Sequence, residues 1–130
     1  MATPVSPKVV HPELSYRIIG TAFKVFNNIG YGFGERHYQR AFANALAAVA
    51  IPFTKEQLVT TRYEGQPLGR YFLDFVVDDK IVVELKVRPR LGYTHVKQTM
   101  SYLKSTGYQL AILIYFTRQG VKYRRIVNLA

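Results

Sequence analysis

The segment from Tyr71 to Val87 constrains the fold most, because it places three charged side chains inside two apolar, β-branched runs. A short polar stretch, Asp-Asp-Lys, separates the runs, which is typical of a β-hairpin. The charges within the predicted strands are Asp74, Glu84 and Lys86. A buried charge is costly unless it is paired or binds a metal ion. The hairpin is therefore predicted to carry a divalent metal site as well as part of a sheet.

The length of the turn decides whether the two carboxylates meet. A two-residue loop would pair Val77 with Lys80 and would turn Asp74 away from Glu84. A three-residue loop pairs Val77 with Ile81 and places Asp74 directly opposite Glu84, at the cost of a non-glycine residue in the left-handed region. Like charges opposite each other destabilise a sheet, and a bound cation reverses that penalty. The metal hypothesis therefore predicts the three-residue loop.

Oxygen ligands select Mg²⁺, with Mn²⁺ as a substitute, and the chain has no cysteine to offer a softer ligand. The backbone carbonyl of Leu85 is a further candidate ligand. Lys86 shares a strand face with Glu84 and could orient or deprotonate an attacking water. The alternative, which the strand pattern alone favours, is a structural salt bridge between Glu84 and Lys86 on a solvated face.

Apolar periodicity predicts the remaining elements. A helix is expected from Pro12 to a cap at Gly30, and a second from about Glu35 to Ala50. Strands are expected over 55–63, 68–77, 80–87, 108–116 and 121–127, with a third helix over 94–106. The run 110–114 is continuously apolar, as in a central strand covered on both faces, and 121–127 is expected at an edge. This order predicts an α/β fold with a mixed sheet.

Two helical patterns add candidate site residues. Glu35 falls on the apolar stripe of the second helix, where a first-turn glutamate favoured by the helix dipole is an equally good explanation. Gln98 and Tyr102 are neighbours on one face of the third helix and could contact a phosphate or a base, although an ordinary boundary stripe explains them too. His95 lies on the same flank and is interpreted as a surface or boundary residue.

The net charge of +10 favours a polyanionic partner, which could be DNA, RNA or an anionic membrane surface, and of these we expect nucleic acid. No apolar stretch is long enough to span a bilayer, and the N-terminus lacks the apolar core of a signal peptide. Together with the absence of cysteine, this fits a cytoplasmic protein. We expect a flexible arm over 1–12 and a single domain over 13–130, for which a homodimer is plausible.

Taken together, these residues resemble the PD-(D/E)XK nuclease superfamily. The resemblance is carried by Asp74, by Glu84-Leu85-Lys86, and by Gln98 with Tyr102, an arrangement similar to that of the recombination-exonuclease branch. The segment 32–38 matches Gly-x-x-Glu-x-x-Tyr and resembles the small bacterial proteins named for this GxxExxY motif. Leu73 stands where the superfamily's name has proline.

The resemblance implies a restriction-endonuclease-like α-β-β-β-α-β core and a nuclease that depends on Mg²⁺ and acts on nucleic acid, with DNA favoured over RNA. It implies that Glu35, Asp74 and Glu84 are metal ligands, that Lys86 is the active-site lysine, and that Gln98 and Tyr102 are supporting active-site residues. Candidates for contacts with backbone phosphates are Arg36, Arg88, Arg90 and Lys97. The alternative function is an inactive nucleic-acid-binding module or accessory subunit with the same fold.

Overall fold

The computed structural model describes residues 10–90 and 92–129. The helices of this part are α1 (Pro12–Ile29), α2 (Glu35–Ala48) and α3 (Tyr93–Thr106). Its strands are β1 (Phe53–Tyr63), β2 (Gln66–Val77), β3 (Ile81–Val87), β4 (Leu110–Thr117) and β5 (Gly120–Val127). The order along the chain, helix, helix, three strands, helix and two strands, is the predicted one.

In the described part of the chain, the strands form one five-stranded mixed sheet in the order β1-β2-β3-β4-β5. Strand β3 runs parallel to β4, and the other neighbouring pairs are antiparallel. The helix α3 makes the crossover between the two parallel strands, as such a connection requires. The predicted α/β fold with a mixed sheet flanked by helices is confirmed.

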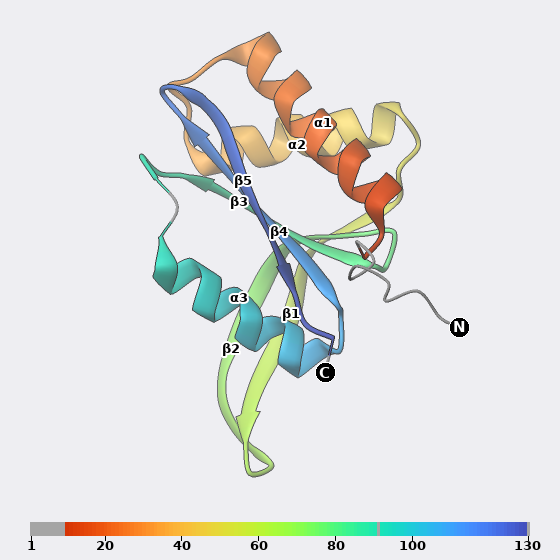
Figure 1. Ribbon diagram of the computed structural model, residues 1–130, viewed down its shortest axis with the longest axis vertical. Coiled ribbons are helices and arrows are strands. Elements are labelled where there is room, and N and C mark those ends of the chain that lie inside the picture. The colour runs from red at the N-terminus through yellow and green to blue at the C-terminus, as the bar shows by residue number, and fades with distance from the viewer. Residues whose placement is uncertain (1–9, 91, 130) are drawn as a thin grey trace, which may run out of the picture.

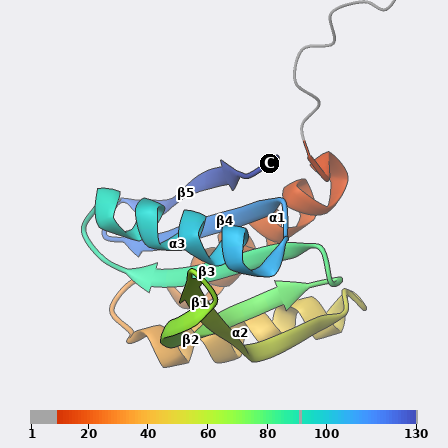
Figure 2. The same ribbon diagram turned by 90° about the horizontal axis from the view of Figure 1, so that it is seen from below.

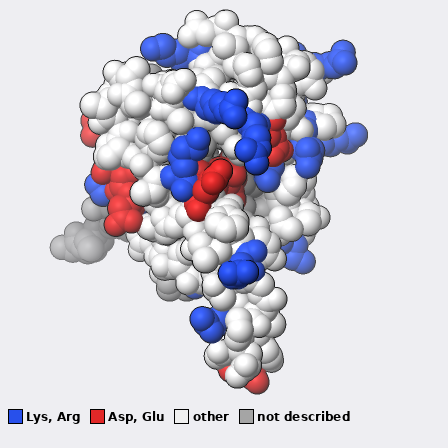
Figure 3. Space-filling view, turned by 180° about the vertical axis from the view of Figure 1, so that it is seen from behind, with Lys and Arg blue, Asp and Glu red and all other residues white. Residues whose placement is uncertain are grey.

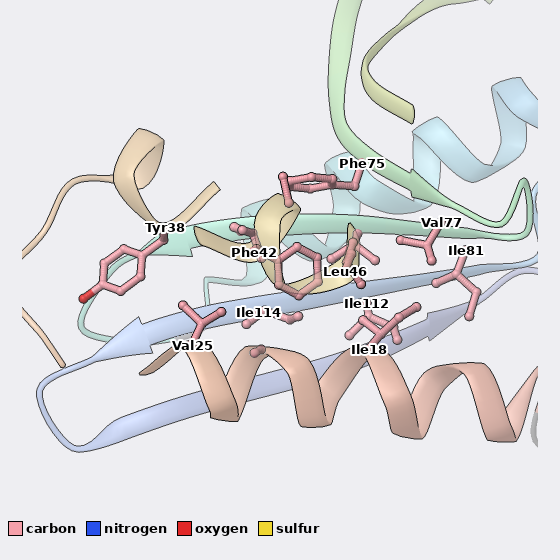
Figure 4. Close-up of a cluster of buried hydrophobic side chains, with 14 of the residues drawn as sticks. Ile18, Val25, Tyr38, Phe42, Leu46, Phe75, Val77, Ile81, Ile112 and Ile114 are labelled. Carbon is pink, nitrogen blue, oxygen red and sulfur yellow. The ribbon is translucent and has the colours of Figure 1, made fainter. Parts of the chain in front are cut away.

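The helices α1 and α2 cover one face of the sheet, and α3 covers the other (Figures 1 and 2). Under α1 and α2, side chains such as Ile18, Phe42 and Leu46 are fully buried against Phe75 and Ile112 of the sheet (Figure 4). The amphipathic periodicity of the two helices explains this arrangement, because their apolar residues recur every three to four positions.

The core under α3 is smaller and contains Leu103 and Tyr102 of the helix, packed against Leu73, Val82 and Leu113 of the strands. Every residue of β4 is buried, as predicted for a strand covered on both faces. The strand β5 lies at an edge of the sheet, as its alternating basic and apolar residues indicated.

The helix ends agree with the expected signals. Pro12 occupies the first turn of α1, and the N–H of Gly30, whose φ is 75°, donates to the Phe26 carbonyl at 2.8 Å. Residues 1–9 of the predicted flexible arm lie outside the described residues. Val10, at its end, packs against the larger core, and its carbonyl accepts a 2.6 Å hydrogen bond from Arg125. None of the helices in the described ranges is both long and apolar enough to cross a membrane.

Candidate active site where strands β2 and β3 separate

The ladder between β2 and β3 stops at the two carboxylates. Val77 pairs with Ile81, and the last paired residues are Phe75 and Val83, so Asp74 and Glu84 face each other next along the strands. The backbone N–H of Asp74 donates to Glu84 Oε2 at 2.9 Å, and the N–H of Leu85 donates to Asp74 Oδ2 at 2.8 Å. These two side-chain bonds replace ladder bonds and hold the carboxyl groups together.

The predicted three-residue loop is therefore confirmed. The N–H of Lys80 donates to the Val77 carbonyl at 3.0 Å, and Asp78 and Asp79 have φ values of 51° and 52°. Two non-glycine residues, rather than one, occupy the left-handed region, which aspartate tolerates better than most residues.

Burial makes ionisation of both carboxyl groups unfavourable. Glu84 is 5% exposed, and burial, together with the charge of Asp74, raises the pKa of Glu84 to about 8. Burial also raises the pKa of Asp74, against the opposing effects of the Leu85 N–H and the charge of Lys86. The pair carries two negative charges only at a high cost, so it favours binding a proton or a cation.

Lys86 lies one step further along the face that carries Glu84. Its charge lowers the pKa of both carboxyl groups. The ion pairs within 4 Å among the described residues do not include Lys86, so the alternative of a Glu84–Lys86 salt bridge is not observed. The ammonium group is thus close enough to act on the pair without being fixed to it.

Glu35 begins α2 and reaches the end of β3. Its Oε1 accepts a 3.4 Å hydrogen bond from the N–H of Val87 and lies 3.7 Å from Arg88 Nη1. The charge of Glu35 raises the pKa of Asp74, so the two groups share one electrostatic environment. In the described ranges, however, no three His, Asp or Glu side chains are close enough together to hold a metal ion.

The donor set at Asp74 and Glu84 still fits a divalent cation. Backbone hydrogen bonds engage one oxygen of each carboxyl group, and the raised pKa values indicate a deficit of positive charge. Carboxylate oxygens are the ligands that Mg²⁺ and Mn²⁺ prefer.

Tyr102 of α3 lies near this pair. Tyr102 is 7% exposed and its ring lies 4.8 Å from that of Tyr71. Burial, with the charges of Glu84 and Asp74, raises the pKa of Tyr102 to about 12, so the phenol remains protonated. Gln98 is exposed one helical turn earlier.

The carboxylates of Asp74 and Glu35 line an open pocket of about 390 Å³. Its other lining residues are Arg36, Gln39, Lys55, Glu56 and Phe72. Figure 3 shows acidic side chains in a hollow of the surface, with Lys and Arg side chains around it. Sequence reasoning missed Lys55 and Phe72, because each reads locally as an ordinary strand residue.

The four basic residues predicted to contact phosphates occupy different places. Arg36 lines the pocket with Asp74, and Arg88 lies beside Glu35. Arg90 lines a separate pocket with Tyr31, Arg118 and Lys122 among others. The ammonium group of Lys97 lies 5.8 Å from the ring centroid of Tyr93.

His95 is linked to the sheet beside the site. Its Nδ1 lies 2.6 Å from the hydroxyl of Tyr115, the residue that pairs with Lys86 across β3 and β4. Burial and the charges of Lys86 and Arg88 lower the pKa of His95. The half-buried position agrees with the interpretation as a boundary residue.

Comparison with known proteins identifies a family. The sequence model described as the PD-(D/E)XK nuclease superfamily matches residues 12–126. No curated protein matches the chain significantly.

Solved structures share the fold at low sequence identity. An alkaline exonuclease, LHK-Exo, from Laribacter hongkongensis aligns with a TM-score of 0.53 and 12% identity, over 98% of this chain and 72% of the exonuclease. The same exonuclease in complex with dAMP aligns with a TM-score of 0.51 and 15% identity, over 86% of this chain and 69% of the exonuclease. A protein named SSO0001 aligns with a TM-score of 0.55 and 16% identity, over 91% of this chain and 57% of its own length.

Proposed function

Because this chain belongs to the PD-(D/E)XK nuclease superfamily, we propose that it is a divalent-metal-dependent nuclease that hydrolyses phosphodiester bonds of nucleic acid, with DNA preferred over RNA. The observation that carries the proposal is the buried pairing of Asp74 with Glu84, next to the charge of Lys86. A structural ion pair would not require two adjacent carboxyl groups with raised pKa values.

Asp74 and Glu84 would hold Mg²⁺ or Mn²⁺ through their carboxyl oxygens, with the Leu85 carbonyl and Glu35 as further ligands. Such a cation, when bound, polarises a phosphate and lowers the pKa of a bound water. The backbone N–H groups of Asp74 and Leu85 fix the two carboxyl groups in position before substrate arrives. Preorganisation of this kind avoids the cost of ordering them during the reaction.

Lys86 would orient the attacking water and compensate the negative charge that develops on the phosphoryl oxygens. Its freedom from a 4 Å ion pair with a described residue supports this role, because the ammonium can move to the substrate. Tyr102, which stays protonated, can donate a hydrogen bond to a phosphate oxygen, and Gln98 can do the same from the preceding turn.

Within the superfamily, we propose that the chain belongs to the GxxExxY group, whose motif matches residues 32–38. Glu35 of that motif lies at the end of β3 beside the proposed site. Tyr38 is fully buried, stacks on Phe116 at 4.2 Å between ring centroids, and donates a 2.6 Å hydrogen bond to the Gly30 carbonyl. These contacts give the tyrosine a structural role, which is to position the first turn of α2.

A second candidate function is a nucleic-acid-binding module that does not cut. The attachment of Glu35 to Val87 and Arg88, rather than to the carboxylate pair, favours it. The net charge of +10 supports nucleic-acid binding in either case.

The test is an Mn²⁺-supplemented cleavage assay on linear, circular, single-stranded and branched DNA and on RNA. Wild type should cut at least one substrate, and Glu84→Gln should not. Lys86→Ala should lose cleavage but keep binding within about threefold, since one phosphate contact contributes little. Binding without turnover on every substrate would favour the second candidate.

A further inference from the structure

Phe72 is an exposed aromatic residue in the pocket of the carboxylates. It is 65% exposed and lines the same pocket as Asp74, Glu35, Arg36 and Lys55. A single exposed apolar side chain needs no explanation in general. This ring differs because it shares a concave surface with Asp74, one member of the carboxylate pair, and with other charged side chains. These are Glu35, Glu56, Arg36 and Lys55, whereas Glu84 is not among the residues that line the pocket.

The strand itself explains why Phe72 faces this pocket. Leu73 and Val76 both pack under α3, although residues three apart in a regular strand point to opposite faces. The alternation therefore shifts between them, at the level of Glu56, whose φ is 55° and which lies opposite Asp74 in β1. As a result, Asp74 meets Glu84 in the sheet and also lines the pocket that contains Phe72.

Beyond this shift, β1 and β2 continue together as a two-stranded arm that projects from the molecule (Figure 1). Leu58, the partner of Phe72 in β1, is also exposed. The base of the arm thus presents an exposed apolar face, from which the Phe72 ring lines the pocket that contains Asp74.

A nucleotide offers two groups that match these features. Its phosphate can bind a cation held by the carboxylate pair, and its base can stack on an aromatic ring. A base inside a duplex already has neighbours on both faces, so a protein ring can stack only on a base that is unpaired or unstacked. Arg36 and Lys55, which line the same pocket, can contact the flanking phosphates.

We propose that Phe72 stacks on an unpaired base next to the phosphate that is cut, so that the site takes single-stranded segments, such as flaps or frayed ends, in preference to continuous duplex. This inference rests on the proposed function, because it places the scissile phosphate at Asp74 and Glu84.

The test compares Phe72→Ala and Phe72→Trp with Leu68→Ala. Leu68 is a matched control, because it is 67% exposed on the same strand but lines a different pocket, with Arg62 and Tyr71. Binding of a fluorescein-labelled single strand and of a closed duplex hairpin is measured by anisotropy in EDTA, where metal-dependent cleavage does not consume them. Quenching of 2-aminopurine in the single strand reports stacking directly.

Phe72→Ala should weaken single-strand binding between about fivefold and about a hundredfold, the range that stacking on one ring provides. Its affinity for the duplex should change less than about twofold. Phe72→Trp should restore single-strand binding and quenching, and Leu68→Ala should match wild type.

Equal losses for both nucleic acids, or no loss for the single strand, would overturn the proposal. A change in the sedimentation of Phe72→Ala without a change in its DNA binding would also overturn the proposal. That result would show that Phe72 contacts a second copy of the chain rather than a base. Failure of the proposed function has a different signature: wild type would cut nothing with Mn²⁺, while the effect of Phe72→Ala on single-strand binding would remain.

Discussion

The buried carboxylate pair should make the metal-free protein less stable as the pH rises, and Glu84→Gln should remove this effect. The ordinary pKa of Glu84, 4.5, applies to the unfolded chain, and the folded-state pKa is about 8. Because the folded state holds the proton more tightly, the stabilisation is complete below about pH 4.5 and is lost as the pH rises through about 8.

The structure sets the size of this effect. Each pKa unit corresponds to about 1.4 kcal/mol, so the difference between the folded-state and unfolded-state pKa of Glu84 sets an upper limit of about 5 kcal/mol on the pH-dependent change in the free energy of unfolding. Proton sharing with Asp74 divides the effect between the two groups, so we expect Glu84→Gln to be about 2–3 kcal/mol more stable than wild type above pH 8. The glutamine oxygen can still accept the bond from the Asp74 N–H, and near pH 5 the two proteins should differ by less than about 1 kcal/mol.

The measurement is urea denaturation in EDTA, followed by circular dichroism at about pH 5, pH 6.5 and pH 8.5. Glu64→Gln, which removes an exposed carboxyl group from the turn between β1 and β2, is the control and should keep the pH dependence of wild type. If wild type and Glu84→Gln show the same slope of stability against pH, Glu84 is not held protonated by burial, and the electrostatic reasoning fails.

Three further outcomes are expected. Saturating Mg²⁺ or Mn²⁺ should raise the Tm of wild type near pH 8 by several degrees, because the cation binds the carboxylate pair of the folded state. The Tm of Asp74→Ala should rise by less than one degree. Equal shifts of both proteins in a thermal melt would contradict the assignment of Asp74 as a metal ligand. Tyr38→Phe should lower the free energy of unfolding by about 1 kcal/mol, because it loses the 2.6 Å hydrogen bond to the Gly30 carbonyl. The measurement is urea titration, and an unchanged free energy of unfolding would show that this bond does not stabilise the first turn of α2. Leu46→Ala should lower the free energy of unfolding by about 2–5 kcal/mol, because the fully buried side chain leaves a cavity under α2 when it is removed. A decrease below about 1 kcal/mol in the same urea titration would mean that this core is loosely packed.

Local pattern was sufficient for most of the fold. The apolar stripe ending at Gly30 predicted α1, and the continuous run 110–114 predicted a buried strand. The register of β2 and β3 was predicted only through the metal hypothesis, since the residues allowed a two-residue loop as well and only a three-residue loop brings Asp74 and Glu84 opposite each other. The pairing of a few adjacent residues depends on turn length and side-chain alternation, which are properties of the local chain.

The tertiary structure alone decided how the site is assembled. The sequence could not show that Glu84 is almost fully buried, that Glu35 binds Val87 and Arg88, or that Phe72 lies in the pocket of Asp74. These features depend on how α2, α3 and the β1–β2 arm pack around the end of one ladder. Burial, and with it the pKa of a carboxyl group, is set by atoms distant in sequence, whereas the periodicity that specifies a helix or strand is contained in the segment itself.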